Sequence, residues 1–348
     1  MNAMMDTAGE RWEWLVLRFT CGSLPLFKLQ ELLMRLLLIC FVLFFAVAEG
    51  VPANADVRGD VKALFERDMN TVDFAEIMVA AESIINPRID ADAMLAEIDR
   101  MATQVGTAVP ETAPEWSKVD AIRQYIYEPG YWNNDRAFSY DLDDPYGQIF
   151  ENRLMSDYLA DRRGNCITMP LLFIAIGQRL GLDMRPSLAP LHLFVRFTTK
   201  DGESHNIEAT NGGLRADNSP YLDNMPITPA AVTNRVFLAT LTNEEAVAVI
   251  AVVVVEYLLK EKRYRDAMAV ADILLDHYPN YAYAMVKKGT AAYYLLKTKF
   301  YELYPTPAEV PENQQPYLVY LQRVNQSAFD KADGLGWLPG QGSINVSE

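Results

Sequence analysis

The chain has 348 residues, of which 50% are hydrophobic and 11% aromatic, so it is long enough for about two domains with apolar cores. Its formal net charge of -15 argues against nucleic acid as a partner, because phosphates require a basic surface. The chain contains three cysteines, and only one of them lies beyond residue 40.

Near the N-terminus, residues 36–48, LLLICFVLFFAVA, form an apolar run that follows basic residues and precedes small ones. This order is typical of a secretory signal peptide. The run is shorter than the roughly 20 apolar residues of a membrane span. We therefore predict a signal peptide at 34–55, a true start at Met34 and export to the periplasm, with residues 1–33 as an upstream extension. The alternative is an uncleaved inner-membrane anchor at 36–48, which is the one membrane contact we expect.

After the signal segment, the spacing of apolar side chains predicts four helical stretches. They lie at 56–85, 90–106, 120–127 and 151–161. Asp90 is a suitable N-cap for the second stretch. Residues 131–150 are aromatic and acidic, and we predict an irregular conformation for them.

The irregular stretch contains an acidic cluster, Asp141, Asp143 and Asp144. It lacks the regular ligand spacing and the glutamate of an EF-hand, so we do not predict a calcium site. We expect these carboxylates to pair with Arg162 and Arg163 instead.

Cys166 precedes a strongly apolar stretch, Ile167–Leu182, which predicts a helix buried on nearly all sides. Pro170 is tolerated only in a first helical turn, so Cys166 stands at or just before the helix start. There the helix dipole favours the thiolate, which is the nucleophilic form of cysteine. Without the signal peptide, Cys166 is the only thiol of the chain. It is therefore either an inert core residue or a reactive group.

Two strand-like runs follow this helix. Residues 191–197, LHLFVRF, alternate as in a half-buried strand and include His192. Asp201-Gly202 predicts a hairpin turn, and the returning strand carries Glu208. A two-residue turn places His192 and Glu208 on opposite faces of the hairpin, whereas a three-residue turn places them on the same face. The sequence leaves both arrangements open.

A thiol, an imidazole and a carboxylate in this order suggest nucleophilic catalysis. The imidazole accepts the thiol proton, and the carboxylate orients the ring. We therefore predict Cys166, His192 and Glu208 as catalytic residues, with Asn206 and Asn211 as alternative orienting groups. Each also has a structural explanation, as a core cysteine, a satisfied histidine or a solvated strand charge. The sequence has no zinc, P-loop or dinucleotide motif, and we predict no metal and no cofactor.

From about residue 228 the chain is predicted to be helical. Apolar spacing indicates four helices, at 243–260, 265–277, 281–298 and 314–333. Ala267 and Pro279 stand at the spacing of a tetratricopeptide repeat, over about one and a half repeat units. We therefore predict a separate tetratricopeptide-like region at 228–348 with a surface for a protein partner.

Residues 73–215 resemble a bacterial transglutaminase-like family, the SirB-type core. The resemblance lies in the stretches DFAEIMVAAESIINPRIDADAMLAEIDRMA, ENRLMSDYLADRRGNCITMPLLFIAIGQRLGL, LAPLHLFVRF and NIEATNGG. It implies an α+β, papain-like core at 56–227, in which a helix-borne cysteine packs on a small antiparallel sheet that carries histidine and an acid. Many SirB-type members lack the cysteine that this chain has at Cys166. Active transglutaminase-like enzymes usually carry aspartate where Glu208 stands.

Together these observations predict an exported thiol-dependent acyl transferase, or an amidase or peptidase, that acts on peptide or protein amides. The alternative is a non-catalytic envelope scaffold with a vestigial site, in which the helical tail binds a protein partner.

Overall fold

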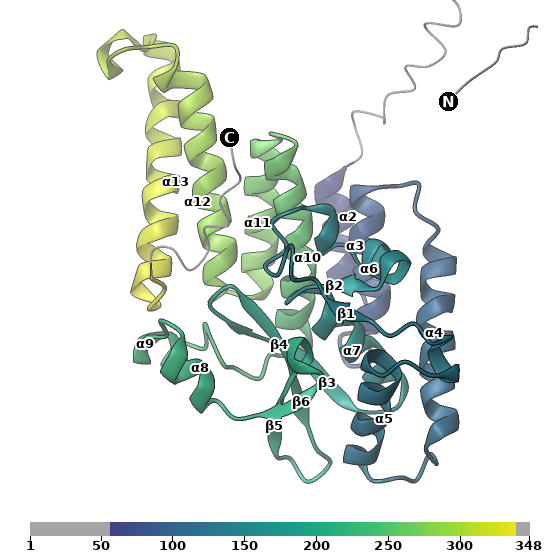
Figure 1. Cartoon of the computed structure of the whole chain (residues 1–348). Coiled ribbons are helices and arrows are strands. Elements are labelled where there is room, and N and C mark those ends of the chain that lie inside the picture. Colours follow the sequence, from purple (N-terminus) through teal and green to yellow (C-terminus); the bar gives the residue numbers. More distant parts are fainter. Residues whose placement is uncertain (1–55, 339–348) are drawn as a thin grey trace, which may run out of the picture. The chain divides into compact units, whose positions relative to one another are not determined.

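The computed structural model describes residues 56–338, so the predicted signal peptide lies outside the described part of the chain. Helices predominate, and small sheets lie among them, as predicted (Figure 1). The helices are α2 (Val57–Phe65), α3 (Phe74–Ile85), α4 (Ala91–Ala108), α5 (Glu115–Tyr127), α6 (Met155–Asp161), α7 (Thr168–Arg179), α8 (Ser219–Asn224), α9 (Pro229–Thr233), α10 (Asn243–Lys260), α11 (Tyr264–His277), α12 (Ala282–Leu296) and α13 (Gln315–Gly334). None of the helices within 56–338 is long and apolar enough to cross a membrane.

Two sheets are present in the described residues. The larger is antiparallel, with strand order β3-β4-β5-β6, and the smaller is a parallel pair of two-residue strands. The strands are β1 (Ser139–Tyr140), β2 (Arg163–Gly164), β3 (Asp183–Ala189), β4 (His192–Thr198), β5 (Ser204–Glu208) and β6 (Leu214–Ala216). The sequence analysis identified β4 and β5 but not β3, whose residues DMRPSLA include a proline and do not alternate cleanly.

The register of the β4–β5 hairpin decides whether His192 and Glu208 lie on the same face of the sheet. Val195 pairs with Ile207 and Thr198 with Ser204, and the Thr199 amide donates to the Glu203 carbonyl. The turn therefore contains three residues, 200–202, and its last residue is a glycine with a φ of +88°, as is usual for a three-residue hairpin. As a result, residues 192, 194 and 208 share one face of the sheet.

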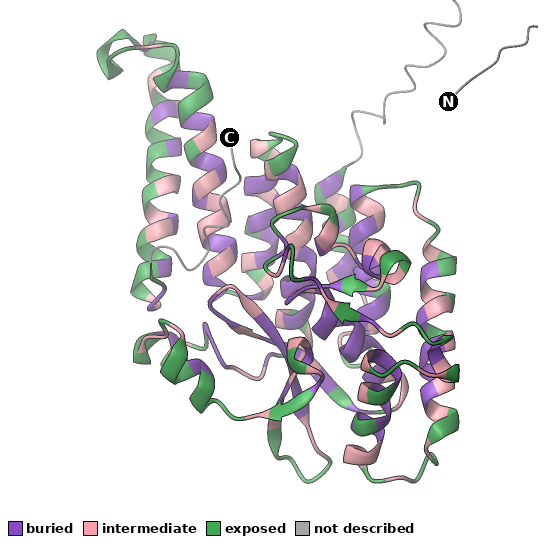
Figure 2. Ribbon diagram, in the orientation of Figure 1, coloured by how far each residue is buried: buried purple, intermediate pink, exposed green. Residues whose placement is uncertain are grey.

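Helix α7 lies against the opposite face of this sheet. It packs on β3 and β4 and is flanked by α3, α4 and α5. Leu193, Val195 and Phe197 on that face belong to the main apolar core. Figure 2 shows that buried positions dominate α7 and the central strands. The helix predicted after Cys166 is therefore confirmed as buried nearly all round.

The face that carries His192 is also covered. There Phe194 stacks on Tyr221 with ring centroids 4.7 Å apart. It belongs to a second apolar cluster that includes Phe237 and Trp337 from distant parts of the chain. His192 is thus held between the sheet and the segments that follow it.

The C-terminal helices were predicted closely. Helix α10 begins with a capping box, in which Thr242 and Glu245 each accept the other's backbone amide. Helices α10 to α13 each pack on the next, and α10 also packs on α3 and β3. Residues on both sides of the predicted boundary at 227/228 thus share one apolar core. The boundary and the tetratricopeptide-like character of the tail stay predictions.

Candidate active site

Asn165 fixes the start of helix α7. Its Oδ1 accepts the amides of Ile167 (2.9 Å) and Thr168 (3.3 Å), while its Nδ2 donates to the Asn152 carbonyl (2.7 Å). The side chain is completely buried. This cap holds Cys166 just before the first turn of the helix, as the position of Pro170 predicted.

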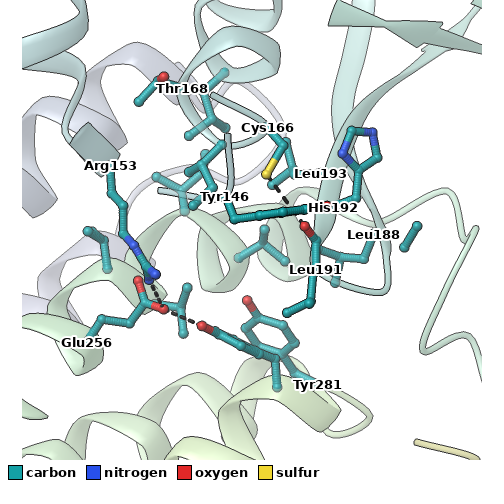
Figure 3. A pocket seen from close by; sticks show the side chains of 18 of the residues that line it. Tyr146, Arg153, Cys166, Thr168, Leu188, Leu191, His192, Leu193, Glu256 and Tyr281 are labelled. Carbon is teal, nitrogen blue, oxygen red and sulfur yellow. Dashed lines mark hydrogen bonds and ion pairs between the residues drawn. The ribbon is translucent and has the colours of Figure 1, made fainter. Parts of the chain in front are cut away.

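Cys166 is 3% exposed, and its Sγ donates to the Leu191 carbonyl oxygen at 3.5 Å (Figure 3). Leu191 forms the β3–β4 turn with Pro190, and its φ is +54°. A non-glycine residue in this left-handed region costs about 1–3 kcal/mol, and such residues cluster at functional sites. The turn brings both the Leu191 carbonyl and the adjacent His192 to the side of the thiol.

Glu208 is the carboxylate that contacts His192. Its Oε2 lies 2.8 Å from Nε2 of the imidazole and also accepts the Tyr221 hydroxyl at 2.8 Å. Its Oε1 accepts the Thr210 hydroxyl at 2.7 Å. The alternatives do not reach the ring, because Asn206 donates to Asn218 (2.9 Å) and Asn211 is exposed.

The charges of His192 and Glu208 influence each other's pKa values. Burial lowers the pKa of His192, but the hydrogen bonds and negative charges of Cys166 and Glu208 outweigh it and raise this pKa to about 9. Burial raises the pKa of Glu208, but the hydrogen bonds from His192, Thr210 and Tyr221 outweigh it and lower this pKa. Because Nε2 is engaged by Glu208, Nδ1 is the ring nitrogen that remains for the sulfur.

The raised pKa of His192 predicts a pH-dependent stability. The folded value is about 9 and the ordinary value 6.5, so the contribution is complete below pH 6.5 and lost as the pH rises to 9. Its size is on the order of 3 kcal/mol. Urea unfolding at pH 6 and pH 9.5 should show this loss in the wild type and a smaller loss in His192→Gln. Equal losses in the two proteins would contradict the coupling.

Two hydrogen-bond donors converge beside the sulfur. The Cys166 amide donates to the Pro145 carbonyl oxygen at 3.5 Å, and the Tyr140 hydroxyl donates to the same oxygen at 3.1 Å. Burial and the nearby Cys166 raise the pKa of Tyr140 to about 12. The sequence analysis did not identify Tyr140, because it lies in a stretch without periodicity and nothing there indicated that β1 pairs next to Cys166.

Ion pairs connect the acidic loop at 141–144 to strand β2, which precedes Cys166. Arg163 pairs with Asp141 (2.5 Å) and Asp143 (2.7 Å), as predicted. The prediction for Arg162 was wrong: its backbone is left-handed, with a φ of +65°, and its side chain donates to the Asn133 carbonyl at 3.0 Å. Within residues 56–338 no group of three or more His, Cys, Asp or Glu side chains is placed to hold a metal ion.

A family model described as the transglutaminase-like superfamily matches residues 92–250. Cys166, His192 and Glu208 all lie inside the match. The chain therefore contains a transglutaminase-like domain over this range, which confirms the resemblance at the level of the superfamily. No curated protein and no solved structure matches the chain.

Proposed function

We propose that the protein is a thiol-dependent acyl transferase or hydrolase of peptide or protein amides, with a SirB-type, papain-like core. The observation that carries the proposal is the His192–Glu208 pair, which lies on one sheet face beside the sulfur at the start of a buried helix. The transglutaminase-like domain at 92–250 supports it. Export through the signal peptide at 34–55 would place the activity in the cell envelope.

In the proposed reaction, Nδ1 of His192 takes the proton of Cys166. The thiolate attacks the amide carbonyl carbon, a C–S bond forms, and the negative charge moves to the carbonyl oxygen. That oxygen would take the place of the Pro145 carbonyl between the Cys166 amide and the Tyr140 hydroxyl. The C–N bond then breaks, and the imidazolium returns its proton to the departing amine. Water or a second amine releases the thioester, giving hydrolysis or transfer.

Two observations favour the alternative, a non-catalytic scaffold. Cys166 is 3% exposed, and its thiol is satisfied by a backbone carbonyl. Helices α12 and α13 also expose Tyr293, Val319 and Tyr320, each about half exposed, which a protein partner would cover. The two functions differ in whether the sulfur reacts with an acyl donor.

The test uses the full-length chain and 4-nitrophenyl acetate. Attack by Cys166 would form an acetyl thioester and release nitrophenolate, so we expect a burst of one equivalent and a gain of one acetyl group on Cys166 by mass spectrometry. The Cys166→Ala variant should show neither. The matched control is His277→Ala, because this histidine stacks on Phe65 away from the sulfur. A wild type without a burst or adduct would support the scaffold.

A further inference from the structure

A cavity of about 130 Å³ begins at Cys166 and His192 and continues between helices α3, α10 and α12 (Figure 3). Most of its wall is apolar, as the following lining residues show: Leu171, Leu188, Val249, Val253, Phe237 and Trp337. Val253 and Trp337 lie beyond the end of the matched domain at residue 250. The C-terminal helices therefore complete a cavity that the transglutaminase-like domain does not close by itself.

One polar group, the Tyr281 hydroxyl, faces the cavity. Tyr281 is 2% exposed, and its hydroxyl points into the cavity (Figure 3). It makes no hydrogen bond to any residue in 56–338, whereas the neighbouring Tyr283 hydroxyl donates to Glu256. A bound molecule with a polar substituent can form a hydrogen bond with this hydroxyl.

The volume limits what the cavity holds. An engineered apolar cavity of about 150 Å³ binds benzene. A cavity of about 130 Å³ therefore takes one ring and is too small for a long acyl chain. Tyr146, which also lines it, is 51% exposed, so the rim beside this residue gives access from solvent.

We propose that the cavity binds an aromatic side chain of the substrate, next to the carbonyl that Cys166 attacks, with a polar ring substituent bonded to the Tyr281 hydroxyl. A tyrosine side chain has this chemistry: an apolar ring for the walls and a phenol for Tyr281. This assignment rests on the proposed function, since it names the substrate class of the same site. It gives the tail helices a role in substrate selection.

The experiment measures inactivation of the full-length protein by acetylated amino-acid chloromethyl ketones with glycine, phenylalanine or tyrosine side chains. We expect the aromatic reagents to react at least roughly tenfold faster than the glycine reagent, by kinact/KI. We expect tyrosine to exceed phenylalanine by roughly 2- to 10-fold, as one hydrogen bond allows. Tyr281→Phe should abolish this second preference, which tests the hydroxyl with little risk to folding.

A second variant tests the walls. Val253→Phe should fill the cavity and lower the aromatic-to-glycine ratio toward one. Val319→Phe, the same change on exposed positions of α13, should leave the ratio unchanged. Equal rates with glycine and aromatic reagents, or a tyrosine preference that survives in Tyr281→Phe, would overturn the assignment. A Cys166 that reacts with none of the reagents would instead refute the proposed function.

Discussion

Replacing His192 by alanine is expected to slow the alkylation of Cys166 by iodoacetamide roughly 10²-fold at pH 6. An ordinary thiol with a pKa near 8.5 is only about 0.3% thiolate at this pH. In the wild type, His192 has its pKa raised to about 9, so the imidazolium persists beside the sulfur from pH 6 to near pH 9 and stabilises the thiolate. The ratio of the wild-type rate to that of the variant should therefore be largest near pH 6 and should fall as the pH rises above 9.

The measurement is the second-order rate of alkylation between pH 5 and pH 10. Glu208→Gln should give an intermediate profile, because it keeps the contact with the ring but removes the charge. His205→Ala is the matched control, since this histidine contacts Arg215 and Glu203 rather than the thiol. Identical profiles for wild type and His192→Ala would show that the two groups do not act together.

Local patterns were sufficient to predict the elements that carry Cys166, His192 and Glu208. The apolar run after Cys166 indicated a buried helix, and Pro170 placed the cysteine before its first turn. Alternation identified the strand that begins at His192. Glu208 was predicted as the partner of that histidine, with Asn206 and Asn211 as alternatives, because its face of the hairpin depended on whether the turn had two or three residues. The turn has three, and the longer side chain of Glu208 reaches the ring.

Other parts of the site depend on contacts between residues far apart in sequence. The Tyr221 hydroxyl donates to Glu208. Tyr221 lies in the short helix α8, which the sequence analysis did not identify. The wall of the cavity joins Cys166 to Tyr281 and Trp337, more than 100 residues later. No periodicity or motif within one segment predicts a contact between residues so far apart in the sequence. The sequence therefore identified the three side chains of the candidate site, whereas the cavity beside them was found only in the folded chain.

The bottom of the cavity contains a buried group of charges. Arg153 donates to Glu256 at 2.5 Å, and Lys287 lies 3.7 Å from the same carboxylate. Burial raises the pKa of Glu256, but the charges of Arg153 and Lys287 outweigh it and lower this pKa to about 2. Arg153 lies in the transglutaminase-like domain, whereas Glu256 and Lys287 lie on α10 and α12 beyond the match. The group therefore links α10 and α12 to Arg153, which lies within the matched range.

Replacing Glu256 by alanine is expected to lower the free energy of unfolding by about 3–5 kcal/mol, because it leaves two buried cations without a counter-charge. The double variant Arg153→Met/Glu256→Met should lose less than Glu256→Ala, since it removes one of those cations with the anion. Glu151→Ala is the matched control. It breaks the exposed pair with Lys260, also on α10, and should cost less than about 1 kcal/mol.

Urea unfolding of the three variants separates these cases. If Glu256→Ala were no less stable than Glu151→Ala, then Arg153 and Lys287 would be solvated, and water would reach the bottom of the cavity. If the double variant lost as much as Glu256→Ala, the cost would come from lost packing rather than from unpaired charge. The expected order, with Glu256→Ala lowest, would mean that a desolvated charge group joins α10 and α12 to Arg153 at the bottom of the cavity. The shape of the cavity proposed to bind an aromatic side chain would then depend on charged residues beyond the matched range 92–250, and so would the selectivity proposed for Cys166.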